Sequence, residues 1–511
     1  MRTDSSIKNI IFTFGGQAVN LAVKLLSRFI FIKILATEYL GLNGLFSNIL
    51  SLLSLVELGV GPAMTYSMYK PLALKDNEKV KSLMKLYKKM YTIIGILVLV
   101  IGISITPFLP LVIKEMPKID NINFIYILFV INTGISYFYT YKRSLLEADQ
   151  KRYISTLYRQ IFNVILSVLQ IIVLLITGNY ILFLITQIIV TLLENIFVSR
   201  KTDKLYPYIK EKNIEDLDKE TQKSIFKNVS AMIFHKIGSV VVTGTDNLII
   251  SKYIGLVEVG LYSNYSLIIS ALKTILNQVF NSLTASVGNL VALESEEKSY
   301  DVFKKILFFN FWIYSFSSIC LVSLFNNFIT IWLGEGYTFQ IWIVVVIVVD
   351  FYLTGMRKTV LIFRDALGLY WHDRFKPIFE AIINLVVSIL LVQKLGIVGV
   401  LIGTFVSTIT TCMWVEPYIL FKYGIKHNVW SYFRKIILYT ILTIIMTTVF
   451  YLICNHLLVS TSIVYFVIKA FICILGVNLI YAIIFHRTQE FSYFIDLIKK
   501  ILSKVKKRKE E

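Results

Sequence analysis

Long apolar runs dominate the sequence and most restrict what it can fold into. Hydrophobic residues make up 56% of the 511 residues and charged residues only 16%, whereas a soluble domain is about 45–50% apolar and about 25% charged. Many runs reach the ~20 residues that a helix needs to cross a bilayer. We therefore predict an all-α integral membrane protein with about fourteen transmembrane helices. A large soluble helical bundle does not fit this composition.

The predicted spans share high hydropathy and a length near that of a membrane crossing. In chain order they are 9–34, 41–67, 91–113, 122–141, 156–177, 180–199, 228–252, 260–288, 304–325, 340–356, 378–394, 397–420, 436–454 and 463–485.

Basic residues between the spans predict the orientation. Connections rich in Lys and Arg, such as 70–89 and 200–227, alternate with short connections nearly free of them, such as 36–40 and 395–396. Cytoplasmic loops carry the excess of Lys and Arg. We therefore predict a multi-pass protein of the bacterial cell (inner) membrane with both termini in the cytoplasm. This pattern accounts for the net charge of +20 without nucleic acid as a partner.

The C-terminal segment 486–511 has its own pattern. Phe491, Ile495 and Ile498 recur at helical spacing, opposite a basic face that includes Lys499. A basic amphipathic helix is suited to anionic membrane lipids. A frayed, solvated tail is the alternative.

An internal repeat indicates how the helices are grouped. Gly-Leu-Phe-Ser-Asn at 44–48 is matched by Gly-Leu-Tyr-Ser-Asn at 260–264, 216 positions further on. Both blocks follow the first helix of a predicted six-helix unit, and both units start from the cytoplasm. Parallel repeats, related by a pseudo-twofold axis along the membrane normal, are typical of transporters. The predicted domains are an N-lobe with helices 1–6 (1–205), a cytoplasmic linker (206–227), a C-lobe with helices 7–12 (228–421), an added pair, helices 13–14 (436–485), and the basic tail (486–511).

The first predicted span carries a polar stripe. Its five members, spaced by four, three, four and four residues on one helical face, are Thr13, Gln17, Asn20, Lys24 and Arg28. A Lys or Arg at mid-bilayer costs about 2.5–3.5 kcal/mol and usually faces a partner or a watery cavity. The stripe therefore predicts a cavity wall.

Two further stripes and one isolated cation lie in other spans. The stripe in 260–288 consists of Ser266, Ser270, Lys273, Asn277, Asn281 and Thr284. The stripe in 228–252 consists of Asn228, His235, Ser239, Thr243 and Asp246. Lys273 stands at the repeat position of Glu57, and Lys469 is alone in the last span. We interpret His235 as a packing residue, with a proton carrier as the alternative.

The central charges have a positive balance. The cations Lys24, Arg28, Lys236, Lys273 and Lys469 outnumber the carboxylates Glu57 and Asp246. This balance favours an anionic substrate, with the two carboxylates either as counter-ions or as a coupling site for a cation. Four other carboxylates are expected to be helix-end groups, namely Glu194, Asp350, Glu380 and Glu416.

Other chemistry finds little support in the sequence. The four cysteines lie in or beside apolar runs without a C-x-x-C pair, so neither a metal site nor a disulfide framework is expected. No His/Glu/Asp constellation suits acid–base catalysis. We therefore expect a transporter without a cofactor rather than an enzyme.

Several segments occur in a specific order along the chain. They are Glu-Leu-Gly-Val-Gly-Pro at 57–62, Tyr-Lys-Pro-Leu at 69–72, the 260–264 block, Ser-Val-Gly-Asn at 286–289, the long run 364–380, and then Asn384, Ser388 and 396–404. Together they resemble the Wzx-type polysaccharide repeat-unit flippases of the multidrug/oligosaccharidyl-lipid/polysaccharide superfamily. The resemblance spans nearly the whole chain. It implies two six-helix lobes forming a V, plus helices 13–14.

The resemblance also implies a substrate and a site. The substrate would be a glycan linked to undecaprenyl pyrophosphate, moved from the cytoplasmic to the outer leaflet by alternating access. Related flippases place essential cations in helices 1 and 8, where Lys24, Arg28 and Lys273 stand here. We expect these cations to bind the pyrophosphate, with Gln17, Asn20 and Asn277 beside them.

Several properties stay open at this level. O-antigen, capsule, exopolysaccharide and teichoic acid units are all candidate glycans. The energy source would be the membrane potential or a proton or sodium gradient. A polysaccharide polymerase is an expected partner, and a monomer is the expected state. The alternatives are a multidrug cation antiporter, which should have twelve helices and a carboxylate-dominated cavity, and a membrane polysaccharide polymerase, which needs larger outer loops.

Overall fold

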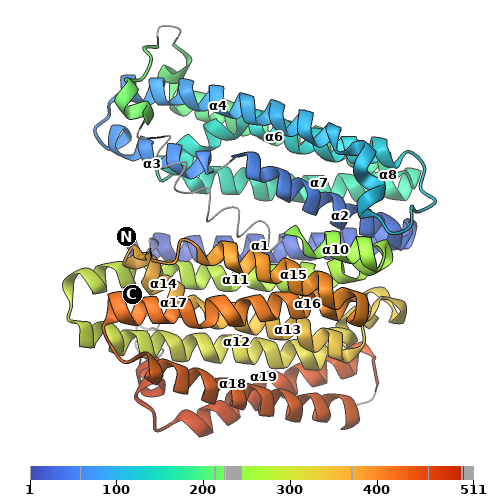
Figure 1. Cartoon of the computed structure of the whole chain (residues 1–511), viewed down its shortest axis with the longest axis vertical. Coiled ribbons are helices and arrows are strands. Elements are labelled where there is room, and N and C mark those ends of the chain that lie inside the picture. Colours follow the sequence, from blue (N-terminus) through green and yellow to red (C-terminus); the bar gives the residue numbers. More distant parts are fainter. Residues whose placement is uncertain are drawn as a thin grey trace. The chain divides into compact units, whose positions relative to one another are not determined.

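The chain is almost entirely helical. The structure, a computed structural model, describes residues 2–57, 59–211, 214–223, 225, 244–369, 372–457, 460–496 and 499. Within these ranges it contains helices and connecting turns and no strand (Figure 1). The predicted all-α class is therefore confirmed.

Two compact units divide the chain, Met1–Leu267 and Ile268–Glu511. The main helices of the first unit are α1 (Arg2–Ile34), α2 (Thr37–Leu53), α3 (Val60–Ala73), α4 (Asn77–Ser104), α5 (Leu109–Val112), α6 (Ile122–Ala148), α7 (Arg152–Thr177), α8 (Tyr180–Leu205) and α10 (Asp246–Tyr253). Helix α11 (Leu256–Leu293) starts in the first unit and continues into the second. The second unit then contains α12 (Glu296–Leu333), α13 (Ile341–Met356), α14 (Lys358–Ala366), α15 (Lys376–Leu395), α16 (Ile397–Ser407), α17 (Met413–Ile419), α18 (Val429–Leu452) and α19 (Ile463–Phe485). The lobe boundaries predicted from the sequence stay predictions.

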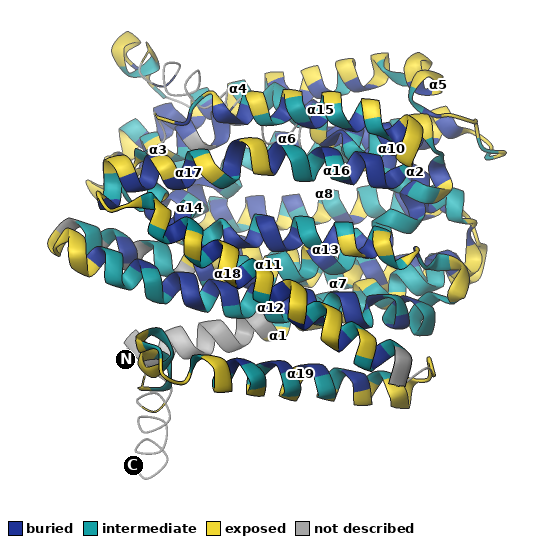
Figure 2. Ribbon diagram, turned by 60° about the horizontal axis from the view of Figure 1, so that its bottom comes forward, coloured by how far each residue is buried: buried dark blue, intermediate teal, exposed yellow. Residues whose placement is uncertain are grey.

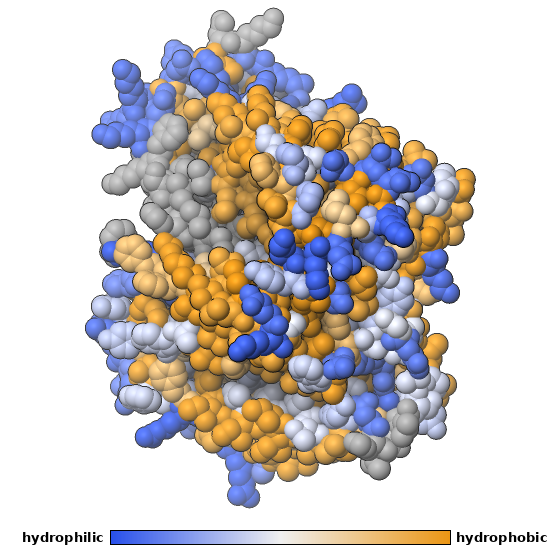
Figure 3. Space-filling model, turned by 45° about the vertical axis from the view of Figure 1, so that its right-hand side comes forward, coloured by the Kyte–Doolittle hydropathy of each residue, from blue (hydrophilic) through white to orange (hydrophobic). Residues whose placement is uncertain are grey.

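The helices have the lengths and surfaces of a multi-pass membrane protein. In the described part of the chain, ten helical segments are long and apolar enough to cross a bilayer. Large apolar side chains point outward, including Ile176 (77% exposed) and Leu475 (65% exposed). Figure 2 shows exposed positions along α18 and α19, and the face drawn in Figure 3 is largely hydrophobic. A surface of this kind is stable against lipid and not against water.

The predicted count of fourteen spans stays a prediction. Most of the predicted span 228–252 lies outside the described residues, and only α10 is seen at its end. Helix α13 coincides with the predicted span 340–356 and has 16 residues, fewer than the ~20 of an ordinary crossing.

One predicted span is broken. The sequence predicts one helix over 41–67, but α2 ends at Leu53 and a short 3-10 turn, Ser54–Glu57, follows. Gly59 then adopts φ 79, in the left-handed region, before α3 begins at Val60. Glycine reaches this conformation without a Cβ clash, so the chain can change direction there. Broken helices of this kind recur in transporters, where backbone groups line a cavity or bind an ion.

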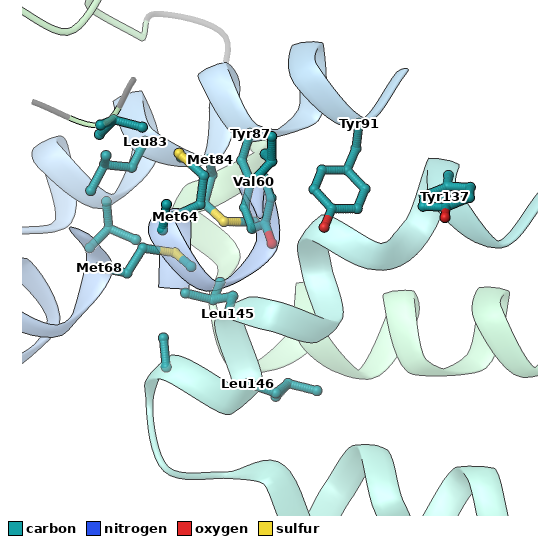
Figure 4. Close-up of a cluster of buried hydrophobic side chains, with 14 of the residues drawn as sticks. Val60, Met64, Met68, Leu83, Met84, Tyr87, Tyr91, Tyr137, Leu145 and Leu146 are labelled. Atoms are coloured by element: carbon teal, nitrogen blue, oxygen red, sulfur yellow. The ribbon is translucent and has the colours of Figure 1, made fainter. Parts of the chain in front are cut away.

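The core of the first unit lies where α3, α4 and α6 meet. Met64 from α3, Leu83 and Tyr87 from α4, and Leu145 from α6 are fully buried together (Figure 4). Tyr87 donates a hydrogen bond to Ser144 Oγ at 2.9 Å, so its hydroxyl is satisfied inside the core. These contacts fix the segment after the break against two long helices.

The described part of the linker binds to α4 through opposite charges. Lys81 Nζ lies 2.6 Å from Glu211 Oε2, and Lys85 Nζ lies 2.8 Å from Asp216 Oδ1. The hydrogen bond and the charge of Lys85 lower the pKa of Asp216. Basic residues that the sequence assigns to the cytoplasm are thus partly neutralised by the linker.

Helices α18 and α19 are joined to α12 by buried hydroxyl groups. Ser315 Oγ lies 2.7 Å from Thr443 Oγ1 of α18 and 2.5 Å from the Tyr481 hydroxyl of α19. The rings of Phe311 and Tyr439 stack with centroids 4.1 Å apart. The added helix pair is therefore packed onto the second unit.

The first residues of the predicted tail also pack onto α12. The described residues 489–496 are helical. The ring of Phe491 stacks on Trp312, with centroids 5.8 Å apart, and that of Phe494 stacks on Phe309 at 5.3 Å. Phe491 therefore contacts protein in this structure. Residues 500–511 lie outside the described part, and the membrane-binding tail stays a prediction.

Candidate anion-binding cavity in the first unit

The polar stripe of α1 meets a cavity of the first unit. Lys24 is exposed and Arg28 is half-buried, one helical turn further along the same face. Both line a cavity of about 250 Å³. Its polar lining consists of Lys24, Ser27 and Arg28 from α1, Asn43 from α2, Asn163, Ser167 and Gln170 from α7, and Gln187 from α8. Its apolar lining consists of Phe31, Leu40, Leu166, Phe183 and Leu267.

The electrostatic balance of this lining is positive. It contains two cations and no carboxylate. Arg28 Nη1 donates a hydrogen bond to Ser263 Oγ of α11 at 3.2 Å, so its described partner is neutral. No carboxylate among the described residues lies within ion-pair distance of Lys24 or Arg28. The guanidinium and ammonium groups are therefore free to bind an anion from outside the chain.

A second polar stripe, on α7, contributes three of its four members to the cavity lining, namely Asn163, Ser167 and Gln170. Gln160, Asn163, Ser167 and Gln170 follow one another at spacings of three, four and three residues, which places them on one helical face. A Cβ added at Gly16 of α1 would lie 2.7 Å from Gln160 Oε1, so the two helices run close together at this level. This stripe was not predicted from the sequence, because it contains no charged residue, although its helical spacing can be read there.

Two other predicted members of the α1 stripe are placed differently. Gln17 and Asn20 are half-buried but do not line the cavity. Asn20 Nδ2 donates to the Gly16 carbonyl of its own helix at 2.9 Å. Gln17 Oε1 is buried and accepts no hydrogen bond from the described residues. Their predicted role in substrate binding stays a prediction.

Lys273 and Asn277 belong to the second unit. Lys273 Nζ lies 3.8 Å from Asp350 Oδ2, so this cation already has a carboxylate partner. Asp350 lies in the interior of α13, so it is not the helix-end group expected from the sequence. Burial, together with the positive charges of Arg357 and Lys273, lowers the pKa of Lys358. Asn277 Oδ1 is buried and accepts no hydrogen bond from the described residues.

The predicted coupling carboxylates lie at breaks or ends of helices. Glu57 stands at the break between α2 and α3 and accepts a hydrogen bond of 2.5 Å from the Tyr91 hydroxyl. Asp246 begins α10, and its Oδ1 atom is buried. Both positions suit a counter-ion or a coupling site, and their roles stay predictions.

Of the remaining predicted residues, the structure describes Lys469 but not His235 or Lys236. Lys469 is 1% exposed within α19. Two buried thiols lie on the same helix pair, with Cys454 Sγ and Cys473 Sγ 3.7 Å apart. His235 and Lys236 lie outside the described residues. Within the described part of the chain, no group of three His, Cys, Asp or Glu residues has the arrangement of a metal site.

The repeat blocks meet in the first unit through glycines. A Cβ at Gly41 of α2 would lie 2.0 Å from the Leu256 carbonyl oxygen. A Cβ at Gly260 would lie 2.9 Å from the Thr37 carbonyl oxygen. Real Cβ atoms do not approach backbone this closely, so α2 and the first turns of α11 touch only because both positions are glycine. The sequence shows the repeat but not that its copies are in contact.

A buried ion-pair network in the second unit was also not foreseen. Glu416 of α17 is fully buried and accepts two hydrogen bonds from Arg357, at 3.0 and 2.7 Å. Lys376 forms a further charged contact with the same carboxylate. Arg364 Nη1 lies 2.6 Å from Asp373 Oδ2, which is buried as well. Glu416 stands in the first turn of α17, near a helix end as expected, but its partners come from α15 and the α13–α14 junction, which the sequence did not indicate.

Comparisons with known proteins identify the architecture. No family model matches the chain, and no curated protein matches its sequence. Among solved structures, lipid II flippase MurJ in an inward closed conformation matches with a TM-score of 0.63 and 16% identity, covering 93% of this chain and 99% of that one. An inward-facing multidrug resistance MATE family transporter of the MOP superfamily matches with a TM-score of 0.61 and 15% identity, covering 78% and 94%.

A mutant of the Vibrio cholerae MATE transporter VcmN matches with a TM-score of 0.57 and 14% identity, covering 84% of this chain and the whole of that one. The chain therefore shares its fold with these solved structures. At these identities the likeness extends to the fold, and the MOP fold hosts both a lipid flippase and multidrug transporters.

Proposed function

We propose that this MOP-fold protein is a lipid-linked oligosaccharide flippase. It moves glycan repeat units on undecaprenyl pyrophosphate from the cytoplasmic to the outer leaflet of a bacterial inner membrane. The observation that carries the proposal is the cavity with Lys24 and Arg28 and without a carboxylate. A diphosphate is the feature common to all such substrates, and two cations are its natural partners.

The spacing of the two cations suits a diphosphate. Residues four apart on a helix lie one above the other, about 5.4 Å along the axis per turn. The two phosphates of one pyrophosphate can therefore contact Lys24 and Arg28 at the same time. The Arg28 fork can bind two oxygens, whereas Lys24 acts as a point charge.

Transport follows from binding if the substrate favours one state over another. Closing the cavity around a bound anion relieves the repulsion between the two cations, so the loaded protein has a different inward/outward balance from the empty one. The membrane potential, or a proton or sodium gradient acting at Glu57 or Asp246, supplies the direction. The lipid tail stays in the bilayer while the headgroup crosses.

A multidrug transporter is the second candidate, favoured by the likeness to MATE transporters. A cavity for organic cations requires carboxylates to balance their charge. The lining of this cavity supplies none. This difference favours the flippase.

Complementation of a flippase-null bacterial strain tests the proposal. The wild-type gene should restore glycan export, and Arg28→Ala should reduce it by about tenfold or more at equal protein abundance. Lys33→Ala removes an exposed cation of the same helix that does not line the cavity, so it should export normally. Wild-type export by Arg28→Ala would contradict the proposal, and resistance to cationic drugs without export would favour the multidrug transporter.

A further inference from the structure

The cavity has two chemically different walls. The α1 wall carries positive charge, whereas the wall formed by α7, α8 and α2 carries the amides of Asn163, Gln170, Gln187 and Asn43. An anion needs only the first wall. Four amides in the lining of so small a space indicate a second, neutral and polar part of the ligand.

We propose that this amide wall binds the sugar that is bonded directly to the pyrophosphate, and that it selects among substrates by this first sugar. The inference rests on the proposed flippase function and adds the part of the glycan that is recognised. It also divides the site, with α1 binding the phosphates and α7 with α8 binding the sugar.

Amide chemistry fits a sugar. A primary amide offers two donors and one acceptor oxygen, and a sugar hydroxyl can both donate and accept. Amides carry no charge, so they contribute less to the binding of the phosphates than Lys24 and Arg28 do. A polar group left without a partner in a buried site costs about 1–3 kcal/mol, so a sugar with a hydroxyl in the wrong place is disfavoured.

Three of the four amides are available for a ligand. No hydrogen bond within the described chain engages the side chains of Asn163 or Gln187, and both are half-buried at the cavity surface. Gln170 Nε2 makes only a long hydrogen bond, 3.4 Å, to the Phe183 carbonyl oxygen. Polar groups that serve packing alone are normally paired when buried.

The apolar lining of the cavity provides aromatic surface on which a sugar ring can pack. Phe31 and Phe183 both line the cavity, and their rings contact edge to face with centroids 5.4 Å apart. Ligand sites commonly combine aromatic surface with a few placed polar groups. The C–H face of a pyranose can rest on such rings while its hydroxyls meet the amides.

The size of the cavity limits what is recognised. Its volume of about 250 Å³ is just below the ~300–1,000 Å³ of drug-sized ligand pockets. This space suits one sugar residue beside the anion and not a whole repeat unit. Later sugars would therefore project out of the cavity and would be tolerated in many forms.

Binding by the purified full-length protein in lipid nanodiscs tests the division. The probes are undecaprenyl pyrophosphate without sugar, and the same lipid carrying N-acetylglucosamine or galactose. The wild type should bind at least one glycosylated probe more tightly than the bare lipid. The double variant Asn163→Leu/Gln187→Met should lose about tenfold in affinity for that probe and keep the wild-type affinity for the bare lipid.

Two controls separate this inference from the proposed function. Gln160→Met changes an amide of the same α7 stripe outside the cavity and should bind every probe as the wild type does. Arg28→Ala should weaken the binding of all probes, and failure to do so contradicts the flippase proposal itself.

The double variant decides the inference about the sugar. If it weakens the binding of bare and glycosylated lipid equally, or weakens neither, the inference is overturned. A wild type that prefers no glycosylated probe would also overturn it. Unchanged thermal unfolding of each variant excludes misfolding as the cause.

Discussion

The cations of α1 and those around Glu416 have opposite surroundings. Arg28 has a neutral hydroxyl as its described partner in the first unit, whereas Arg357 makes two hydrogen bonds to a fully buried carboxylate in the second. A cation that is already paired is part of the architecture, because removing either partner leaves a buried charge uncompensated. A cation without such a partner gains most from a ligand. Burial and charge alone do not distinguish a structural cation from a ligand-binding one. The presence or absence of a carboxylate partner does.

The largest expected effect tests the paired side of this comparison. Glu416→Gln leaves Arg357 and Lys376 without their shared carboxylate, and breaking a buried ion pair costs about 3–5 kcal/mol. The variant should therefore unfold at a clearly lower temperature and accumulate poorly in membranes. Thermal unfolding of the purified protein measures the loss. A midpoint equal to that of the wild type would show that the network is not structural.

The next effect tests the unpaired side. Lys24→Gln/Arg28→Gln should unfold like the wild type, since no described carboxylate loses a partner. Each charged hydrogen bond to a phosphate contributes about 1.5–3 kcal/mol, so the double variant should lose about a hundredfold or more in export rate at saturating abundance. Glycan at the cell surface, normalised to protein level, is the readout. A strong loss of stability with intact export would reverse the comparison.

A smaller effect comes from giving the α1 cations a partner. Leu166 lines the cavity and is apolar. Leu166→Glu would place a carboxylate there, which competes with the substrate for Lys24 and Arg28. Export should fall about fivefold below that of Leu166→Gln, which has the same shape without the charge, since this corresponds to roughly 1 kcal/mol. Equal export by the two variants would mean that the electrostatic balance of the lining is unimportant.

The smallest effect concerns a pair at the surface. Lys426 Nζ and Glu296 Oε1 are 2.6 Å apart, but both side chains are more than half exposed. Exposed pairs contribute little because water and salt screen them. Glu296→Gln should therefore leave both thermal unfolding and export unchanged. A lowered unfolding midpoint would show that proximity alone, without burial, makes a pair structural.

The sequence predicts the parts of the fold and site that depend on periodicity. Helical spacing identifies the face of α1 with Lys24 and Arg28, and the same rule would have identified Asn163, Ser167 and Gln170 on α7. The length of the apolar runs predicts the helices. The break after Leu53 is indicated in the sequence only by nearby glycines and Pro62, and both residue types also occur inside continuous helices.

Contacts between distant elements could not be predicted in this way. Glu416 is stabilised by Arg357 and Lys376, which lie 59 and 40 positions away, and no local pattern indicates that the three side chains converge. The same holds for Lys273 and Asp350, which come from different helices. Phe491 has the spacing of a membrane-facing residue, yet it stacks on Trp312, because a ring is as stable against an apolar helix as against lipid.

The contact between Gly41 and the first turns of α11 has one further consequence. It is made by backbone atoms, with no side chain on the glycine to choose a rotamer. Two helices that meet in this way can separate and return without any side-chain ordering, which elsewhere costs up to about 2 kcal/mol for each long side chain. At these glycines, α2 and α11 therefore pack by close backbone approach and not by interdigitating side chains. At these two glycines the contact forms without the loss of side-chain entropy that a pair of long side chains would suffer there.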